Sequence, residues 1–287
     1  MLEEVFAFGG DVSGVVPPNV SKRLRMRAQS GIMFLGQEAE PGTPGKRSNI
    51  RKPCMTTNFH LLGTEHLIIL GAVPTLGATF AVVHRKLSPD IRWPRICLAS
   101  ILLLDSALFY GYMALHGQLT FPNHLPLELC DASLCLVIIA LFTLNKTVFD
   151  LAYYGALAGA SMALLTPNLW EPFPSFTTVQ FFVAHGLIVA ATLYLLWSKQ
   201  ARPRPGSVAR AMLGLNLFAA LVGTFDFIFK TNYMYLRSKP PNASLLDLLG
   251  PWPWYILAAE AVAWLVFLLL YLPFRASNLR NDSFMRD

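Results

Sequence analysis

The strongest constraint on the fold of this chain is a series of apolar runs, each long enough to cross a lipid bilayer. A membrane-spanning helix needs about 20 apolar residues to cross roughly 30 Å of hydrocarbon. Several runs of this sequence meet that requirement, at about 62–84, 94–117, 125–144, 147–166, 176–198, 208–229 and 252–274. We therefore predict an all-α fold, a polytopic membrane helical bundle of about seven transmembrane helices.

The composition supports this class and excludes others. Hydrophobic residues make up 54% of the chain and charged residues only 14%, whereas soluble domains carry about 25% charged residues. The net charge of +6 would suggest nucleic-acid binding in a soluble protein. Here the basic residues lie between the apolar runs, where they set topology and contact anionic lipid headgroups. We expect membrane phospholipids as partners and no nucleic acid, and the sequence leaves the oligomeric state open.

The chain divides by composition into three regions. Residues 59–275 contain the apolar runs and form the predicted membrane domain, and residues 276–287 form a short tail. Residues 1–58 are rich in Gly, Pro, Ser and Arg and show no amphipathic period. We interpret them as a disordered or non-native N-terminal extension, because Met55 stands just before the first apolar run.

The basic residues of the loops predict an orientation. Side A denotes the face at which the first run begins, and side B denotes the face at which it ends. Among the side A loops, only residues 230–250 carry basic side chains, namely Lys230, Arg237 and Lys239. The side B loops and the tail carry Arg85, Lys86, Arg92, Lys146, Lys199, Arg202, Arg204, Arg275, Arg280 and Arg286. The positive-inside rule therefore predicts a multi-pass protein of the cell membrane with its N-terminus outside and its C-terminus cytoplasmic.

Ionisable side chains within the apolar runs gather toward side A. Cys130 and Asp131 lie about 8 Å inside side A on the third run, and His185 lies about 13 Å inside it on the fifth. Other polar residues of the side A half are His66, Asp226, Asn232, Tyr233 and Glu260. An ionisable group in a bilayer is costly, and its presence indicates function. The pattern therefore predicts a site that opens toward side A.

Cys130 and His185 are the best candidate for a reactive pair. A thiol becomes a strong nucleophile when a neighbouring imidazole accepts its proton, and the depths of the two residues differ by only about 5 Å. Cys135 is a poorer candidate, since it lies about 140° around the helix from Cys130. The structural alternative is that the cysteine is a small packing residue and that the histidine hydrogen-bonds a neighbouring helix.

Several other chemistries lack their sequence signals. No Lys lies inside a predicted helix, which excludes a retinal Schiff base, and neither HExxH nor GxSxG occurs. The four cysteines show neither a CxxC pair nor zinc-site spacing; they are Cys54, Cys97, Cys130 and Cys135. We expect no metal and no cofactor.

Three motifs together resemble the YwaF-type family of bacterial integral membrane proteins. They are LPLELCDASL (125–134), VQFFVAHGLIV (179–189) and TNYMYLRSKPPNASLLDLLGPWPWY (231–255). The segments TEHL (64–67) and LLTPNLWEPFP (164–174) fit the same pattern, so that the resemblance extends from about residue 59 to residue 274.

This family is related to an animal multi-spanning acyltransferase that acts on ether phospholipids. It is related more distantly to intramembrane threonine hydrolases of fatty acid esters of hydroxy fatty acids. The resemblance implies a compact helical bundle with a cysteine nucleophile and a histidine partner, at Cys130 and His185. One departure is Glu128, where we expect a His or another polar residue.

The leading hypothesis is a lipid acyltransferase or lipid ester hydrolase. Cys130 would attack an ester carbonyl, and His185 would act first as the base and then as the acid. Supporting roles at the same site are expected for Asp131, Asn232, Tyr233, Glu260 and His66.

Two other hypotheses remain. One is a non-enzymatic transporter or small-ligand-binding membrane protein, in which Glu260 and Asp226 would be cation or proton sites. The inverted repeats and interrupted helices that are typical of transporters are not found in the sequence. The other is a packing scaffold, which the dense polar motifs toward side A disfavour.

Overall fold

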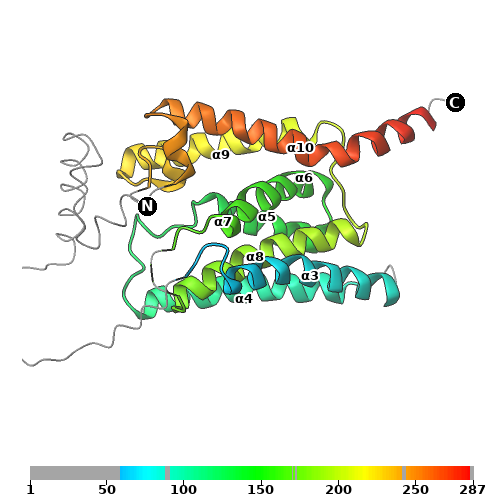
Figure 1. Ribbon diagram of the computed structural model, residues 1–287, viewed down its shortest axis with the longest axis horizontal. Helices are drawn as coiled ribbons and strands as arrows, with labels where there is room; N and C mark the ends of the chain where they lie inside the picture. Colours follow the sequence, from blue (N-terminus) through cyan, green and yellow to red (C-terminus); the bar gives the residue numbers. More distant parts are fainter. Residues whose placement is uncertain (1–58, 88–90, 170, 172, 241–243, 285–287) are drawn as a thin grey trace, which may run out of the picture. The chain divides into compact units, whose positions relative to one another are not determined.

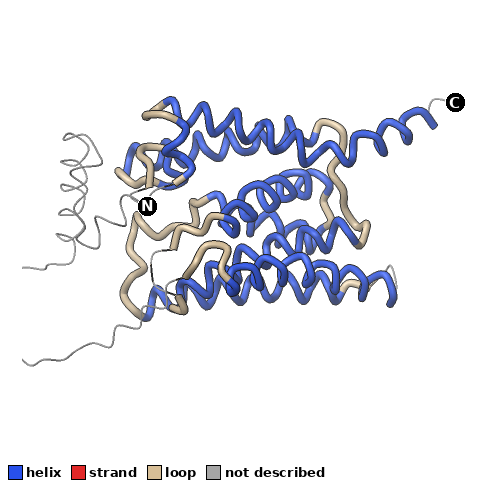
Figure 2. The backbone as a smooth tube through the Cα atoms, viewed as in Figure 1, coloured by secondary structure: helices blue, strands red, loops and turns tan. Residues whose placement is uncertain are grey.

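The computed structural model describes residues 59–87, 91–169, 171, 173–240 and 244–284. All of them belong to one unit, Met55–Asp287. Within them the regular structure is helical and contains no strand (Figure 2). The predicted fold class, an all-α polytopic helical bundle, is confirmed. The expectation of a disordered or non-native extension over residues 1–58 lies outside the described residues.

In the described part of the chain, 6 helical segments are long and apolar enough to cross a membrane (Figure 1). They are α3 (Thr64–Leu87), α4 (Trp93–Leu115), the continuous segment Lys146–Leu165, α8 (Phe176–Trp197), α9 (Ser207–Phe229) and the part Trp254–Arg275 of α10 (Trp254–Phe284). The third predicted run forms a shorter apolar helix, α5 (Leu129–Thr143). Every predicted run therefore contains a helix.

Helix α5 is shorter than predicted because its N-terminus is capped later in the sequence. Glu128 is the N-cap with an extended backbone, and its N–H donates to Asp131 Oδ2 over 3.1 Å. The helix ends at Leu144, which takes a left-handed conformation with φ 52°. Its 15 residues extend about 22 Å. It is therefore shorter than the roughly 30 Å of hydrocarbon that a spanning helix crosses.

The fourth predicted run contains three pieces, α6 (Lys146–Tyr154), the π-helical η1 (Gly155–Ala160) and α7 (Ser161–Leu165). Gly155 lies directly against α5, since a Cβ built on it would lie 2.5 Å from Ser133 Oγ. The Ser133 hydroxyl in turn donates to the Leu129 carbonyl over 2.8 Å. Only a glycine allows this approach, so the packing fixes the first turns of α5 against η1.

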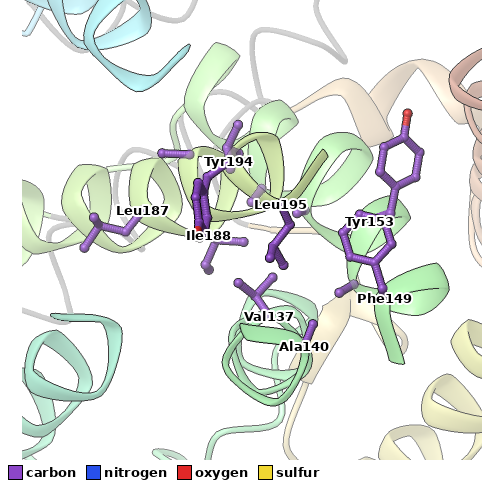
Figure 3. Packing of buried hydrophobic residues seen from close by; sticks show 14 of the residues in the cluster. Val137, Ala140, Phe149, Tyr153, Leu187, Ile188, Tyr194 and Leu195 are labelled. Atoms are coloured by element: carbon purple, nitrogen blue, oxygen red, sulfur yellow. The ribbon is translucent and has the colours of Figure 1, made fainter. Parts of the chain in front are cut away.

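Helix α8 lies at the centre of the bundle. It contacts α3, α4, α5, α7 and η1, and more than half of its 22 residues are buried. A helix that is apolar on all sides is expected to be surrounded by protein. Figure 3 shows the α8 residues Leu187, Ile188, Tyr194 and Leu195 near Val137 and Ala140 of α5 and near Phe149 and Tyr153 of α6.

Helices α9 and α10 complete the bundle. Helix α9 contacts α6, α10 and the 3₁₀ turn η2 (Tyr233–Tyr235), and α10 contacts α9, η1 and the 3₁₀ turn η3 (Leu245–Leu249). Helix α10 continues beyond the predicted end at residue 274 as far as Phe284, with Pro273 inside it.

A buried carboxylate joins α6 to α9 at side B. Asp150 is fully buried and accepts hydrogen bonds from the Nη2 atoms of Arg204, at 2.7 Å, and Arg210, at 2.9 Å. The Arg204 backbone N–H donates to its other oxygen over 3.1 Å. These two guanidinium partners determine where α9 begins against α6.

Candidate active site

Cys130 lies in the first turn of α5, two residues after the N-cap Glu128, and is partly buried. The charges of the Asp131 and Glu128 carboxyl groups act on its thiol. The backbone N–H groups of Cys130 and Asp131 face the sulfur. The hydroxyl groups of Tyr110 on α4 and Tyr235 in η2 are also within electrostatic range of this thiol. Polar groups from three segments therefore act on the thiol.

Residues 231–238, which we name the strap, lie next to the N-terminus of α5. The Tyr233 hydroxyl donates to the Pro122 carbonyl over 2.7 Å and accepts from the Leu125 N–H over 2.8 Å. The Met234 N–H donates to Glu128 Oε2 over 3.0 Å. The strap thus supplies hydrogen-bond partners to the non-helical backbone that precedes α5 and to its N-cap residue.

The strap is held from α9 by Asp226, which is fully buried. Asp226 Oδ1 accepts from the Thr231 hydroxyl over 2.6 Å and from the Tyr233 N–H over 3.0 Å. Its Oδ2 is buried and has no hydrogen-bond partner within the described residues. Asn232 bonds within the strap, because its Oδ1 accepts from the N–H groups of Arg237 and Ser238.

The start of α10 fastens the other edge of the strap. The Tyr255 hydroxyl donates to the Tyr235 carbonyl, and Trp252 Nε1 donates to the Leu236 carbonyl over 3.1 Å. Met234 and Tyr235 have positive φ values of 53° and 54°. A left-handed conformation costs a non-glycine residue about 1–2 kcal/mol. The hydrogen bonds from α5, α9 and α10 offset this cost and impose the conformation.

Burial changes the acidity of two groups that join the strap to α5. Burial raises the pKa of the Glu128 carboxyl group, and the hydrogen bond from the Met234 N–H opposes that change. Burial also raises the pKa of the Tyr233 hydroxyl, and the backbone hydrogen bond with Leu125 opposes it. Both groups are therefore favoured in their neutral forms.

His185 is buried on α8, with 8% of its surface exposed. Its Nδ1 is 2.7 Å from the Phe181 carbonyl oxygen, and its ring lies 4.2 Å from the Phe181 ring, centroid to centroid. A carbonyl can only accept, so Nδ1 carries the proton and Nε2 has the free lone pair of a base. In the described part of the chain no hydrogen bond joins His185 to Cys130, although α5 and α8 are in contact.

His66 is fully buried near the side A end of α3. Its Nδ1 accepts from the Leu62 N–H over 3.0 Å, and its Nε2 is 2.7 Å from the Leu164 carbonyl oxygen at the end of α7. Both ring nitrogens therefore bond to backbone, and His66 joins α3 to α7.

Glu260 bonds elsewhere in the bundle. Its Oε1 accepts from Asn216 Nδ2 over 2.9 Å, which joins α10 to α9. Of the residues expected at the site, the structure thus brings together Cys130, Asp131 and Tyr233, while Asn232 lies within the strap. Glu260 and His66 make their hydrogen bonds with other segments, and His185 bonds within α8.

The contribution of Glu128, Tyr110 and Tyr235 was missed by sequence reasoning. Glu128 was noted only as a departure from a family pattern, yet it caps α5 and binds the strap. Tyr110 and Tyr235 gave no signal, because a tyrosine in or beside an apolar run is ordinarily a packing or interfacial residue. No group of three His, Cys, Asp or Glu side chains that could hold a metal ion occurs among the described residues.

Comparison with known proteins identifies the family. The sequence profile of the TMEM164 family matches residues 61–271, which include the site and all the helices described except the end of α10. The chain belongs to the TMEM164 family. The prediction of a family of integral membrane proteins is confirmed, whereas the name YwaF is not the one that the match carries.

A relative is found in Treponema pallidum (strain Nichols). This TMEM164-family chain is 27% identical to it over 230 residues, which cover 79% of the chain and 95% of the relative. The relative is described as an uncharacterized protein. No solved structure matches the chain.

Proposed function

We propose that this TMEM164-family protein is a lipid acyltransferase or lipid ester hydrolase with Cys130 as its nucleophile and His185 as its base. The observation that carries the proposal is the environment of Cys130. Its thiol lies in the first turn of a helix, faces two backbone N–H groups and is bordered by the strap. Helix N-termini place positive potential where an oxyanion forms.

The reaction begins when Cys130 Sγ attacks the carbonyl carbon of a lipid ester and His185 Nε2 accepts the thiol proton. A C–S bond forms, and the carbonyl electron pair moves to the oxygen. Collapse of this intermediate breaks the ester C–O bond, and the imidazolium returns the proton to the leaving alcohol. The thioester is then attacked by the hydroxyl of an acceptor lipid or by water, which restores the thiol.

The neighbouring carboxyl group of Asp131 favours proton transfer that is concerted with attack. A free thiolate at Cys130 would face this carboxylate, and like charges at short range repel. Catalytic hydrogen bonds commonly tighten when substrate binds. The proposal therefore requires the His185 ring and the thiol to come within hydrogen-bond reach in the lipid complex.

The stabilisation of the oxyanion falls to backbone rather than to the expected strap side chains. Tyr233 uses its hydroxyl on Pro122 and Leu125, and Asn232 bonds within the strap. The Cys130 N–H is the better donor, because it faces the sulfur, whereas the Asp131 N–H already donates to the Glu128 carbonyl over 3.1 Å.

The proposal extends to location and partners. We place the protein in the cell membrane with side B cytoplasmic, the N-terminus outside and the C-terminus inside, since the basic loops gather at side B. The substrates are membrane phospholipids, which reach the thiol within the side A half of the bundle.

A second candidate is a transporter or small-ligand-binding membrane protein. One observation favours it: Asp226 Oδ2 is buried without a hydrogen-bond partner in the described residues, as a proton- or cation-binding oxygen would be. In that case Asp226→Asn would abolish binding or uptake, and Cys130→Ala would leave it intact.

The decisive experiment reconstitutes the purified protein with a phospholipid that carries a labelled acyl chain, together with an unlabelled lysophospholipid. Transferred and released acyl groups are measured by mass spectrometry, and the covalent thioester is trapped and cleaved with hydroxylamine. Cys130→Ala should abolish both signals, and His185→Gln should reduce turnover by about 100-fold or more. Cys135→Ala is the matched control and should resemble the wild type. Acyl transfer at wild-type level by Cys130→Ala would refute the proposal.

A further inference from the structure

Arg95 presents a partly buried cationic group at side B that has no anionic partner among the described residues. It lies in the first turn of α4 and is partly buried. Its Nε is buried and makes no hydrogen bond within the described residues. Its Nη1 donates to the Leu141 carbonyl over 3.3 Å, which is longer than an ordinary hydrogen bond. No ion pair joins Arg95 to a described carboxylate.

The same end of the bundle shows how this fold neutralises arginines elsewhere. Arg204 and Arg210 share the buried carboxylate of Asp150 at 2.7 and 2.9 Å. A buried charge is costly unless it is paired and hydrogen-bonded. The Leu141 carbonyl belongs to the last turn of α5, whose dipole is equivalent to only about half a negative charge. The contrast indicates that the partner of Arg95 comes from outside the described chain.

The groups around Arg95 suit an anion with several acceptor oxygens. The charge of Arg95 acts on the His84 ring and on the Tyr194 hydroxyl, which lie 3.4 Å apart, Nδ1 to oxygen. Arg85, next to His84 on α3, donates to the Trp197 carbonyl at the end of α8. The Tyr194 hydroxyl is fully buried and bonds to His84 and Gln200, so the Arg95 guanidinium is the donor that this neighbourhood offers. A planar guanidinium matches phosphate oxygens in geometry as well as in charge.

An interfacial tryptophan places the site at headgroup depth. Trp93, two residues before Arg95, is 49% exposed and lies against Phe80 with 6.5 Å between ring centroids. Tryptophan concentrates at the level of lipid headgroups. A phosphate at this level would lie within reach of the first turn of α4.

We infer that Arg95, next to the buried pair Tyr194 and His84, forms a binding site for a phosphate-type oxyanion at the side B end of α3, α4 and α8. The site is separate from the proposed acyl-transfer site at side A and stands without it. The same chemistry is offered by an anionic phospholipid headgroup in the side B leaflet and by free phosphate, and the experiment distinguishes these sources.

The test measures retention of lipid by the full-length detergent-purified protein, using native mass spectrometry with phosphatidylglycerol and with phosphatidylcholine of the same chains. The wild type should retain phosphatidylglycerol preferentially, and Arg95→Gln should weaken that binding by about tenfold or more. Arg92→Gln is the matched control, since it removes the same charge from an exposed position three residues earlier. It should change the binding by less than about threefold. Equal losses in the two variants, or no loss in Arg95→Gln, would overturn the site.

If Arg95→Gln does not yield folded protein, Arg95→Lys is the deciding variant. It keeps the charge and removes the planar fork, so it should bind phosphatidylglycerol more weakly than the wild type. Wild-type affinity in Arg95→Lys would then count against the site. The second arm of the test adds millimolar inorganic phosphate as a competitor. If phosphate displaces phosphatidylglycerol from the wild type and not from Arg95→Lys, the site is assigned to free phosphate. Resistance to phosphate, combined with the Arg95-dependent retention, assigns it to the lipid headgroup.

Discussion

Two glycines on α3 give a sharp test of the packing at the centre of the bundle. A Cβ built on Gly77 would lie 2.9 Å from the Ala190 carbonyl oxygen and 3.1 Å from Leu193 Cβ, both on α8. A Cβ built on Gly71, which lies on the same helix, would meet nothing within 4 Å. Gly71→Ala and Gly77→Ala therefore make the same chemical change in two different environments.

The two substitutions share one energy term and differ in another. Alanine is favoured over glycine inside a helix by about 0.5–1 kcal/mol, and this gain applies to both. Overpacking against the α8 backbone costs about 1–3 kcal/mol and applies only to Gly77→Ala. We expect Gly71→Ala to be slightly more stable than the wild type and Gly77→Ala to be about 1–3 kcal/mol less stable than Gly71→Ala.

The measurement is unfolding of each purified variant in mixed micelles with increasing sodium dodecyl sulfate, followed by circular dichroism and tryptophan fluorescence. The difference between the variants isolates the contact of α3 with α8, because the helix-propensity term cancels. Equal stability of Gly71→Ala and Gly77→Ala would refute the close approach of these helices.

Three further predictions concern the strap and the side B ion pairs. Tyr233→Phe removes the bonds to Pro122 and Leu125 and should lower stability by about 1–3 kcal/mol in the same assay; an unchanged midpoint would contradict the strap geometry. The pKa of the Glu128 carboxyl group is raised in the folded protein. This group therefore stabilises the fold below the ordinary carboxyl pKa, and the stabilisation is lost as pH rises through the pKa of the folded state. Glu128→Gln should therefore lose less stability than the wild type between mildly acidic and neutral pH, and parallel pH profiles would count against this. Asp150→Ala should cost about 3 kcal/mol or more by leaving two arginines unpaired, whereas a thermal midpoint like the wild type's would show that water replaces the carboxylate.

The positions of the helices were largely predictable from the sequence. Apolar runs of about 20 residues report the length of a membrane-spanning helix directly. The exceptions have local causes. Helix α5 begins at Leu129, and not at residue 125 as predicted, because Glu128 and Asp131 cap it there. The π-helical stretch Gly155–Ala160 has no periodic signal, and its first residue lies directly against Ser133 of α5.

The candidate site was predictable only in part. Cys130, Asp131 and Tyr233 were recognised as polar residues of one end, and the structure brings them to the same place. His66 and Glu260 were chosen on the same grounds, yet they bond to Leu164 and Asn216. Depth in the membrane does not specify the direction in which a side chain points, and the sequence contains no other measure of it.

The sequence by itself determined that this chain crosses a membrane many times, that it is helical, and which of its few polar residues lie inside the apolar runs. Those properties follow from composition within single runs, where length and hydrophobicity act locally. The tertiary structure alone decided which polar groups meet. Tyr233 bonds to a backbone N–H 108 residues away, and His66 bonds to a carbonyl 98 residues away. Such partners are selected by how helices pack, because a buried polar group takes whichever donor or acceptor the fold brings within about 3 Å.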